Sequence, residues 1–164
     1  MKLKFIKEQI DYVDNWTSNL IADIDEINCG IVENLDTSIN WQIGHLIVSK
    51  YFHSIQSAVK NDSGIISEIN QKVPISELFK YYFAGSSPLE PWKNRPNKKQ
   101  LLEYRNEIDV GTNRILESLT ENTLAEKTEI GNPVAKTKYE ALTFLFKHQM
   151  WHNGQIAMIK RIIG

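Results

Sequence analysis

The stretch that decides the fold is residues 138–163, KYEALTFLFKHQMWHNGQIAMIKRII. It contains no proline, and its only glycine is Gly154. One set of its side chains recurs at steps of three or four residues: Leu145, His148, His152, Gln155 and Ile159. This spacing is the period of an α-helix. We therefore predict a long helix over this stretch, with two histidines one turn apart on its inner face.

Three earlier segments carry the same apolar period, and all five prolines of the chain fall outside the helix interiors. We predict helices over about 3–24 and 39–60, and a third from its cap Asn97 to about Leu119. Four such segments predict an all-α protein built as a four-helix bundle. The chain has 164 residues, of which 41% are hydrophobic, so we expect one domain spanning residues 1–164.

The connection between the second and third predicted helices is unusually long. It contains roughly three dozen residues, where bundle helices are usually joined by about two to eight. We predict a short helix beginning at Pro74, followed by the irregular stretch 85–96, which holds three prolines. A connection of this length can carry the chain back along the bundle. The third helix can then run parallel to the second.

Charge and cysteine content exclude several classes of function. The net charge is −1, so the chain offers no broad field for attracting nucleic acid or anionic lipid, and we expect neither partner. No stretch approaches the roughly 18 apolar residues of a membrane span, and the charged N-terminus does not resemble a signal peptide. Cys29 is the only cysteine, which excludes an internal disulfide and a cysteine-based zinc site. We expect a cytoplasmic protein.

Three of the four histidines predict one metal site. His148 and His152 stand at i and i+4, and His45 occupies an inward position on the segment 39–60. A buried imidazole without a partner is costly to desolvate, and a shared divalent cation supplies that partner. Three protein ligands leave one coordination position open, as in catalytic zinc sites. The spacing alone leaves an alternative open, in which ordinary hydrogen bonds satisfy these histidines.

The residues beside the predicted ligands limit the chemistry. A zincin protease carries its glutamate base next to the first histidine, whereas this chain has Gln149 there, which disfavours proteolysis. His53 lies two turns beyond His45 and roughly 80° around the helix, so we expect it to point away from the site.

Four further residues near the histidines have two readings each. Gly44 costs stability inside a helix, which the close approach of a neighbouring helix or bound ligand would justify; the alternative is a surface glycine of no consequence. Gln155 either orients a ligand or is an ordinary core amide. Trp41 and Trp151 flank the ligands, and we expect both in the core rather than in a pocket.

Two segments resemble the signature of the DinB superfamily, the DinB/YfiT-like metalloenzymes: Trp41-Gln-Ile-Gly-His45-Leu46 and His148-Gln-Met-Trp-His152-Asn-Gly-Gln-Ile156. The resemblance covers nearly the whole chain. It implies an up-down-down-up bundle, a homodimer, and a divalent metal ion (Zn, Ni or Fe) held by His45, His148 and His152. It does not imply a role in DNA repair.

The resemblance also implies a class of reaction. Members with known activity are metal-dependent enzymes that use a low-molecular-weight thiol, as S-transferases or an isomerase. Our leading hypothesis is therefore thiol S-transferase chemistry on a small-molecule substrate. A metal-dependent hydrolase is the second hypothesis, and a non-catalytic dimeric bundle that binds a metal or ligand is the third. No catalytic or substrate-binding residue is assigned at this stage.

Overall fold

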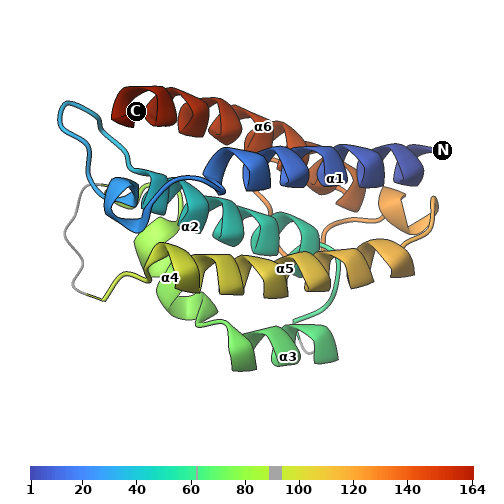
Figure 1. The fold of residues 1–164 in the computed structure, drawn as a ribbon. Coiled ribbons are helices and arrows are strands. Elements are labelled where there is room, and N and C mark those ends of the chain that lie inside the picture. Colours follow the sequence, from blue (N-terminus) through green and yellow to red (C-terminus); the bar gives the residue numbers. More distant parts are fainter. Residues whose placement is uncertain (62, 89–93) are drawn as a thin grey trace.

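The computed structural model describes residues 1–61, 63–88 and 94–164, and these residues form an all-α protein with no strand. Figure 1 shows the longer helices lying along one another, with the short helices beside them. The six α-helices are α1 (Lys2–Ile21), α2 (Ile39–Lys50), α3 (Gly64–Lys72), α4 (Ile75–Tyr82), α5 (Lys98–Ser118) and α6 (Lys138–Ile163).

The longer helices run in two directions, and α2 and α5, which follow each other among them, run the same way. In Figure 1, α1 and α6 run from right to left, whereas α2 and α5 run from left to right. Helix α1 packs against α6, and α2 packs against α4, α5 and α6. Helix α2 is therefore the element that most of the others surround.

The two C-terminal long helices match the predicted bounds closely, and strong local signals define where they begin. The Asn97 side chain accepts from the backbone N–H of Gln100, and the Gln100 side chain accepts from the N–H of Asn97. Thr137 and Glu140 form the same reciprocal capping box at the start of α6. Such a box satisfies backbone donors that helix starts otherwise leave unpaired.

The prediction for the second helix was wrong in two respects. Eleven of the twelve residues of α2 are buried, so it does not present one apolar face to the core. The regular helix also ends at Lys50 and continues as a π-helix, Tyr51–Gln56, in which the Ser57 N–H bonds to the Phe52 carbonyl. The wider turn of a π-helix changes the side on which the following residues project.

The first helix and the crossover also differ from prediction. Helix α1 ends at Ile21, three residues before the predicted end at Ile24, in a turn closed by a bond from the Ile24 N–H to the Ile21 carbonyl. The crossover contains α3, which the sequence analysis missed, before the expected α4. Helix α3 packs on α5, where a Cβ on Gly111 would lie 2.7 Å from Ile69 Cδ1. Residues 89–93 of the proline-rich stretch lie outside the described residues.

A buried ion network, made of Asp14, Lys50, Arg105 and Asp109, joins α1, α2 and α5. Lys50 is 4% exposed, and its Nζ lies 2.5 Å from both Asp14 Oδ2 and Asp109 Oδ1. Arg105 donates to the Asp14 backbone carbonyl at 2.8 Å, and its Nε lies 3.7 Å from Asp109 Oδ2. Two cations face two carboxylates, so the network balances its own charge.

None of the described helices combines the length and the apolar character that crossing a bilayer would require.

Candidate metal centre

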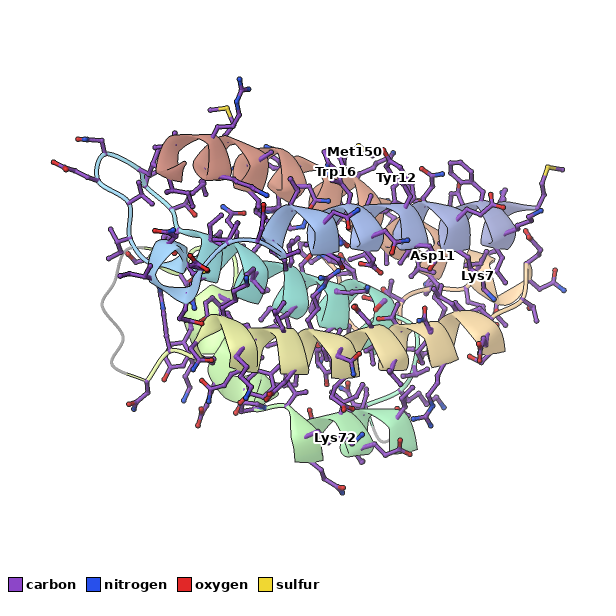
Figure 2. The ribbon with its side chains drawn as sticks, in the orientation of Figure 1. Lys7, Asp11, Tyr12, Trp16, Lys72 and Met150 are labelled. Carbon is purple, nitrogen blue, oxygen red and sulfur yellow. The ribbon has the colours of Figure 1, made fainter. Side chains whose placement is uncertain are left out.

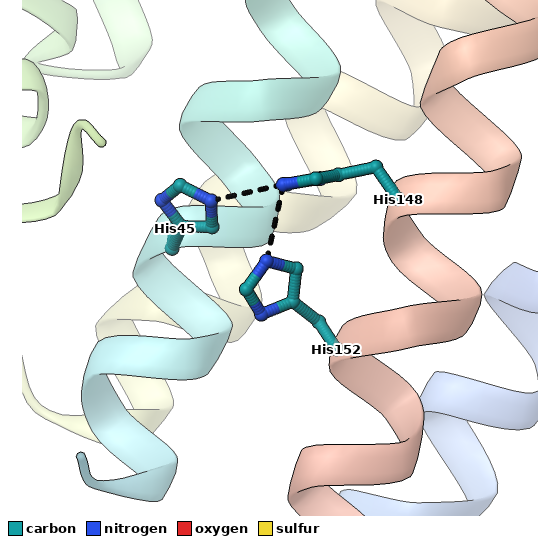
Figure 3. A group of neighbouring side chains, drawn as sticks. All are labelled: His45, His148 and His152. Carbon is teal, nitrogen blue, oxygen red and sulfur yellow. Dashed lines mark hydrogen bonds between the residues drawn. The ribbon is translucent and has the colours of Figure 1, made fainter. Parts of the chain in front are cut away.

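The three predicted ligands converge between the middle of α2 and the middle of α6 (Figure 3). His148 Nε2 lies 3.3 Å from His45 Nε2 and 3.1 Å from His152 Nε2. The ligand atoms of all three imidazoles lie within 4.8 Å of one another. His45 and His152 are buried and His148 is partly buried. The structure therefore brings together every histidine that the sequence assigned to the site.

The opposite ring nitrogen of each histidine has its own partner. His45 Nδ1 lies 2.6 Å from the Tyr82 backbone oxygen, and His152 Nδ1 lies 2.6 Å from Gln42 Oε1. Because carbonyl oxygens only accept, both Nδ1 atoms carry the proton and both Nε2 atoms present a lone pair. His148 Nδ1 lies 3.1 Å from Ser49 Oγ, a hydroxyl that can accept as well as donate.

Burial keeps these imidazoles neutral at pH 7. Desolvation lowers the pKa of His45, against the opposing effect of its hydrogen bond to the Tyr82 backbone. Desolvation, with smaller contributions from neighbouring histidines, lowers the pKa of His148 to about 3 and of His152 to about 4. Neutral imidazoles are the form that binds metal ions. The Nε2 lone pairs of His45 and His152 both point at His148 Nε2, and a divalent cation among the three nitrogens fits this donor set.

A family comparison agrees with this geometry. The family model described as the DinB superfamily matches residues 9–156, a range that contains all three histidines. The chain belongs to the DinB superfamily. No curated protein matches it.

A close approach of α4 to α2 positions His45 in this DinB-superfamily chain. A Cβ on Gly44 would lie 2.4 Å from Tyr82 Cδ1, so only glycine admits the Tyr82 ring there. That approach also brings the Tyr82 carbonyl to His45 Nδ1. The prediction that Gly44 marks a close helix contact is confirmed.

The two tryptophans separate in the structure. Trp41 is 9% exposed and stacks on the His45 ring, with centroids 4.7 Å apart and planes at 9°, so it is a core residue that also supports a ligand. Trp151 is 68% exposed, and the expectation that it lies in the core was wrong. Its position on α6 faces outward because His152, the next residue, faces the centre.

The two glutamines beside the ligands also differ. Gln149 Nε2 donates to Asp14 Oδ1 and Thr17 Oγ1, both at 2.9 Å, so this side chain points toward the ion network. Gln155 Oε1 is buried without a hydrogen-bond partner among the described residues. The Gln155 side chain raises the pKa of His152 slightly, against the larger effect of burial. Gln155 therefore lies beside the site. Its Oε1 atom is not bonded to the backbone, so the interpretation as an ordinary core amide does not hold for this atom.

A small pocket borders the centre on the side of His45 and His148. Its volume is about 130 Å³, and its lining is mostly apolar. His53 also lines it, so the fourth histidine is outside the ligand cluster, as expected, but not remote from the site. The sequence analysis assumed a regular α-helix through this residue, and the π-helix that contains it gives no local sequence signal.

The residues that bond to Nδ1 of these histidines were not predicted from the sequence. Gln42 and Ser49 stand three residues before and four residues after His45, which places both near its side of the helix. That spacing could have identified Gln42 and Ser49 as neighbours of His45 from the sequence. The contribution of the Tyr82 backbone has no sequence signal of its own.

Proposed function

We propose that this DinB-superfamily protein is a metal-dependent enzyme acting on a small molecule, with thiol S-transferase chemistry first and hydrolysis second. His45, His148 and His152 would hold a divalent ion, Zn, Ni or Fe. The observation that carries the proposal is the convergence of three Nε2 atoms whose rings are fixed through Nδ1. First-row metals overlap in their affinity for imidazole, so the ligands do not choose among these ions.

The surroundings of the centre favour a thiol over a water-derived nucleophile. A divalent ion with an open position supplies Lewis acidity, which lowers the pKa of a thiol or of water. Among the described residues no carboxylate joins the histidine cluster, and none lines the adjacent pocket. A hydrolase profits from a base that accepts a proton from water. A low-molecular-weight thiol as co-substrate reaches its reactive form more readily without one.

The adjacent pocket also favours an enzyme over a bundle that only stores a metal. A storage site has no need of a cavity next to its ligands, whereas a reacting molecule must reach them. The pocket is lined by residues of both long connections, including Ala84 and Pro133, so these connections would decide which substrate enters.

Metal analysis and an activity assay test this proposal in two steps. Protein purified without a histidine tag should contain about one metal equivalent, which His148→Ala should lose. Gly154→Ala is the matched control, because this position on the same helix faces open space. Turnover of electrophiles with candidate thiols should then disappear on chelation and return with metal. Metal binding without any turnover would favour the storage alternative.

We also propose that the single domain is an up-down-down-up four-helix bundle that forms a homodimer. The directions of the long helices in Figure 1 support the topology. Figure 2 shows Tyr12, Trp16 and Met150 at one edge of the molecule, along α1 and α6, and Tyr12 is 59% exposed. Sedimentation should give twice the monomer mass, and a monomer at micromolar concentration would contradict the dimer.

A further inference from the structure

The pocket beside the three-histidine centre carries a second polar position, His53. This residue is 8% exposed and lies in the π-helix that follows α2. Its ring centroid lies 4.8 Å from that of Phe144, and the Phe144 ring stacks on His148 at 5.2 Å. Phe144 therefore separates His53 from the ligands, and the pocket borders both histidines.

The hydrogen bonds of Asn132 fix the tautomer of His53. Asn132 Oδ1 accepts from the Val134 backbone N–H at 3.0 Å, a group that can only donate. The amide nitrogen must therefore be the atom that lies 3.0 Å from His53 Nδ1 and 3.1 Å from Ser57 Oγ. Since an amide nitrogen can only donate, His53 Nδ1 accepts. A neutral His53 then carries its proton on Nε2.

The Nε2–H group of His53 has no hydrogen-bond acceptor among the described residues. His53 Nε2 is also absent from the set of fully buried polar atoms without a hydrogen-bond partner. Because His53 lines the pocket, a molecule that enters can reach this donor. The Ser49 hydroxyl also lines the pocket but already bonds to His148 Nδ1, so among the described side chains that line the pocket His53 Nε2–H is the donor without a partner that can orient a ligand with one acceptor.

We propose that His53 is a substrate-binding residue, whose Nε2–H donates to a carbonyl-type acceptor on a small, electrically neutral organic group held in this pocket. The inference rests on the proposed function, since it takes the pocket as the substrate site of the three-histidine centre. Asn132 is the positioning residue that keeps the proton on Nε2.

Charge and size define this substrate class. No lysine, arginine, aspartate or glutamate lines the pocket in the described part of the chain, so in the metal-free protein a charged group would enter without a counter-charge. Burying an unpaired charge is far more costly than burying a hydrogen-bonded carbonyl. A volume of about 130 Å³ corresponds to about four water molecules at roughly 30 Å³ each. The pocket thus fits a short ketone, ester or amide group rather than a carboxylate or an amine.

Nitrogen-15 NMR of the metal-free protein tests the tautomer directly. The His53 ring should show a protonated Nε2 and an unprotonated Nδ1 at pH 7. Asn132→Leu should abolish the preference for a proton on Nε2. If Asn132 had a purely structural role, this preference would not change. A proton on Nδ1 of His53 in the unmodified protein would overturn the proposal.

Titration of the metal-free protein with butan-2-one tests the pocket. The Phe144 and His53 ring signals should shift, whereas butanoate and butylammonium at equal concentration should leave them unchanged. His53→Phe keeps the ring and removes the donor, so the affinity should fall by about 3- to 10-fold, the value of one neutral hydrogen bond. His53→Gln places an amide N–H near the same position and should retain most of the affinity.

These measurements distinguish the inference from the proposed function. Zinc stoichiometry of His53→Phe should equal that of the unmodified protein, because His53 is not a ligand. If zinc binds but butan-2-one binds equally well with and without the donor, only the inference fails. If zinc does not bind, the proposed function fails, while the tautomer and the ketone affinity are still measured. Should His53→Phe not fold, His53→Gln and the unmodified protein decide the question.

Discussion

Two buried polar clusters lie on different sides of α2 and differ in how they are satisfied. The ion network of Asp14, Lys50, Arg105 and Asp109 contains equal numbers of positive and negative groups in contact. The histidine cluster contains three neutral rings whose Nε2 atoms face one another. The network balances its own charge, whereas the cluster is neutral and could bind a cation. The comparison favours a structural role for the first and supports the proposed metal site at the second.

The largest expected effect comes from breaking the network. Lys50→Met should leave Asp14 and Asp109 facing each other without their lysine, and it should lower the free energy of unfolding by about 3–5 kcal/mol. Denaturation by urea measures this change. Lys147→Met, at an exposed position on α6, is the control and should change stability by less than about 0.5 kcal/mol. If the free energy of unfolding of Lys50→Met fell no more than that of the control, the network would not have a structural role.

Adding the missing cation to the histidine cluster should give the next effect. Zinc at 100 times its dissociation constant should raise the free energy of unfolding by about 2.7 kcal/mol, because it binds the folded state. Thermal denaturation with and without zinc measures this. His148→Ala should abolish the stabilisation, and Gly154→Ala should retain it. Equal stabilisation of both variants would show that zinc binds elsewhere.

The partners of Nδ1 offer a finer test of the same cluster. Gln42→Leu removes the acceptor that fixes His152, so metal affinity should fall by about 10- to 100-fold. Competition with a chelator of known affinity measures it. Gln42→Glu keeps an acceptor at this position and should bind metal more tightly than Gln42→Leu does. If the two variants bind alike, the bond to His152 does not tune the centre.

The last expected effect is the pH dependence of the metal-free protein. Burial lowers the pKa of His53 to about 4, as it does for His152, and that of His148 to about 3. An unfolded histidine titrates near about 6.5, so the unfolded state binds more protons between this pH and the folded pKa. The free energy of unfolding should therefore have its full value above about pH 6.5 and should decrease by at least about 1 kcal/mol by pH 5. Urea denaturation at several pH values checks this, and a flat profile would mean that the histidines are not held neutral.

Local signals explain which parts of the structure could be predicted. The starts of α5 and α6 follow from capping residues close in sequence, and the three-histidine cluster follows from helical spacing together with the family signature. The π-helix and the contact of α3 with Gly111 depend on packing between distant segments. Lys50 reads as a surface residue in the sequence and becomes buried because carboxylates from two other helices reach it.

By itself the sequence determined the all-α class, the capped ends of the C-terminal long helices, and the histidines that share one centre. The tertiary structure alone decided the tautomers of His45, His152 and His53, the pocket beside the centre, and the burial of α2 on every side. The physical reason is the range of the interactions. Helix period and capping act within a few residues of one another, whereas the position of a proton on an imidazole depends on an acceptor or donor that a distant segment supplies.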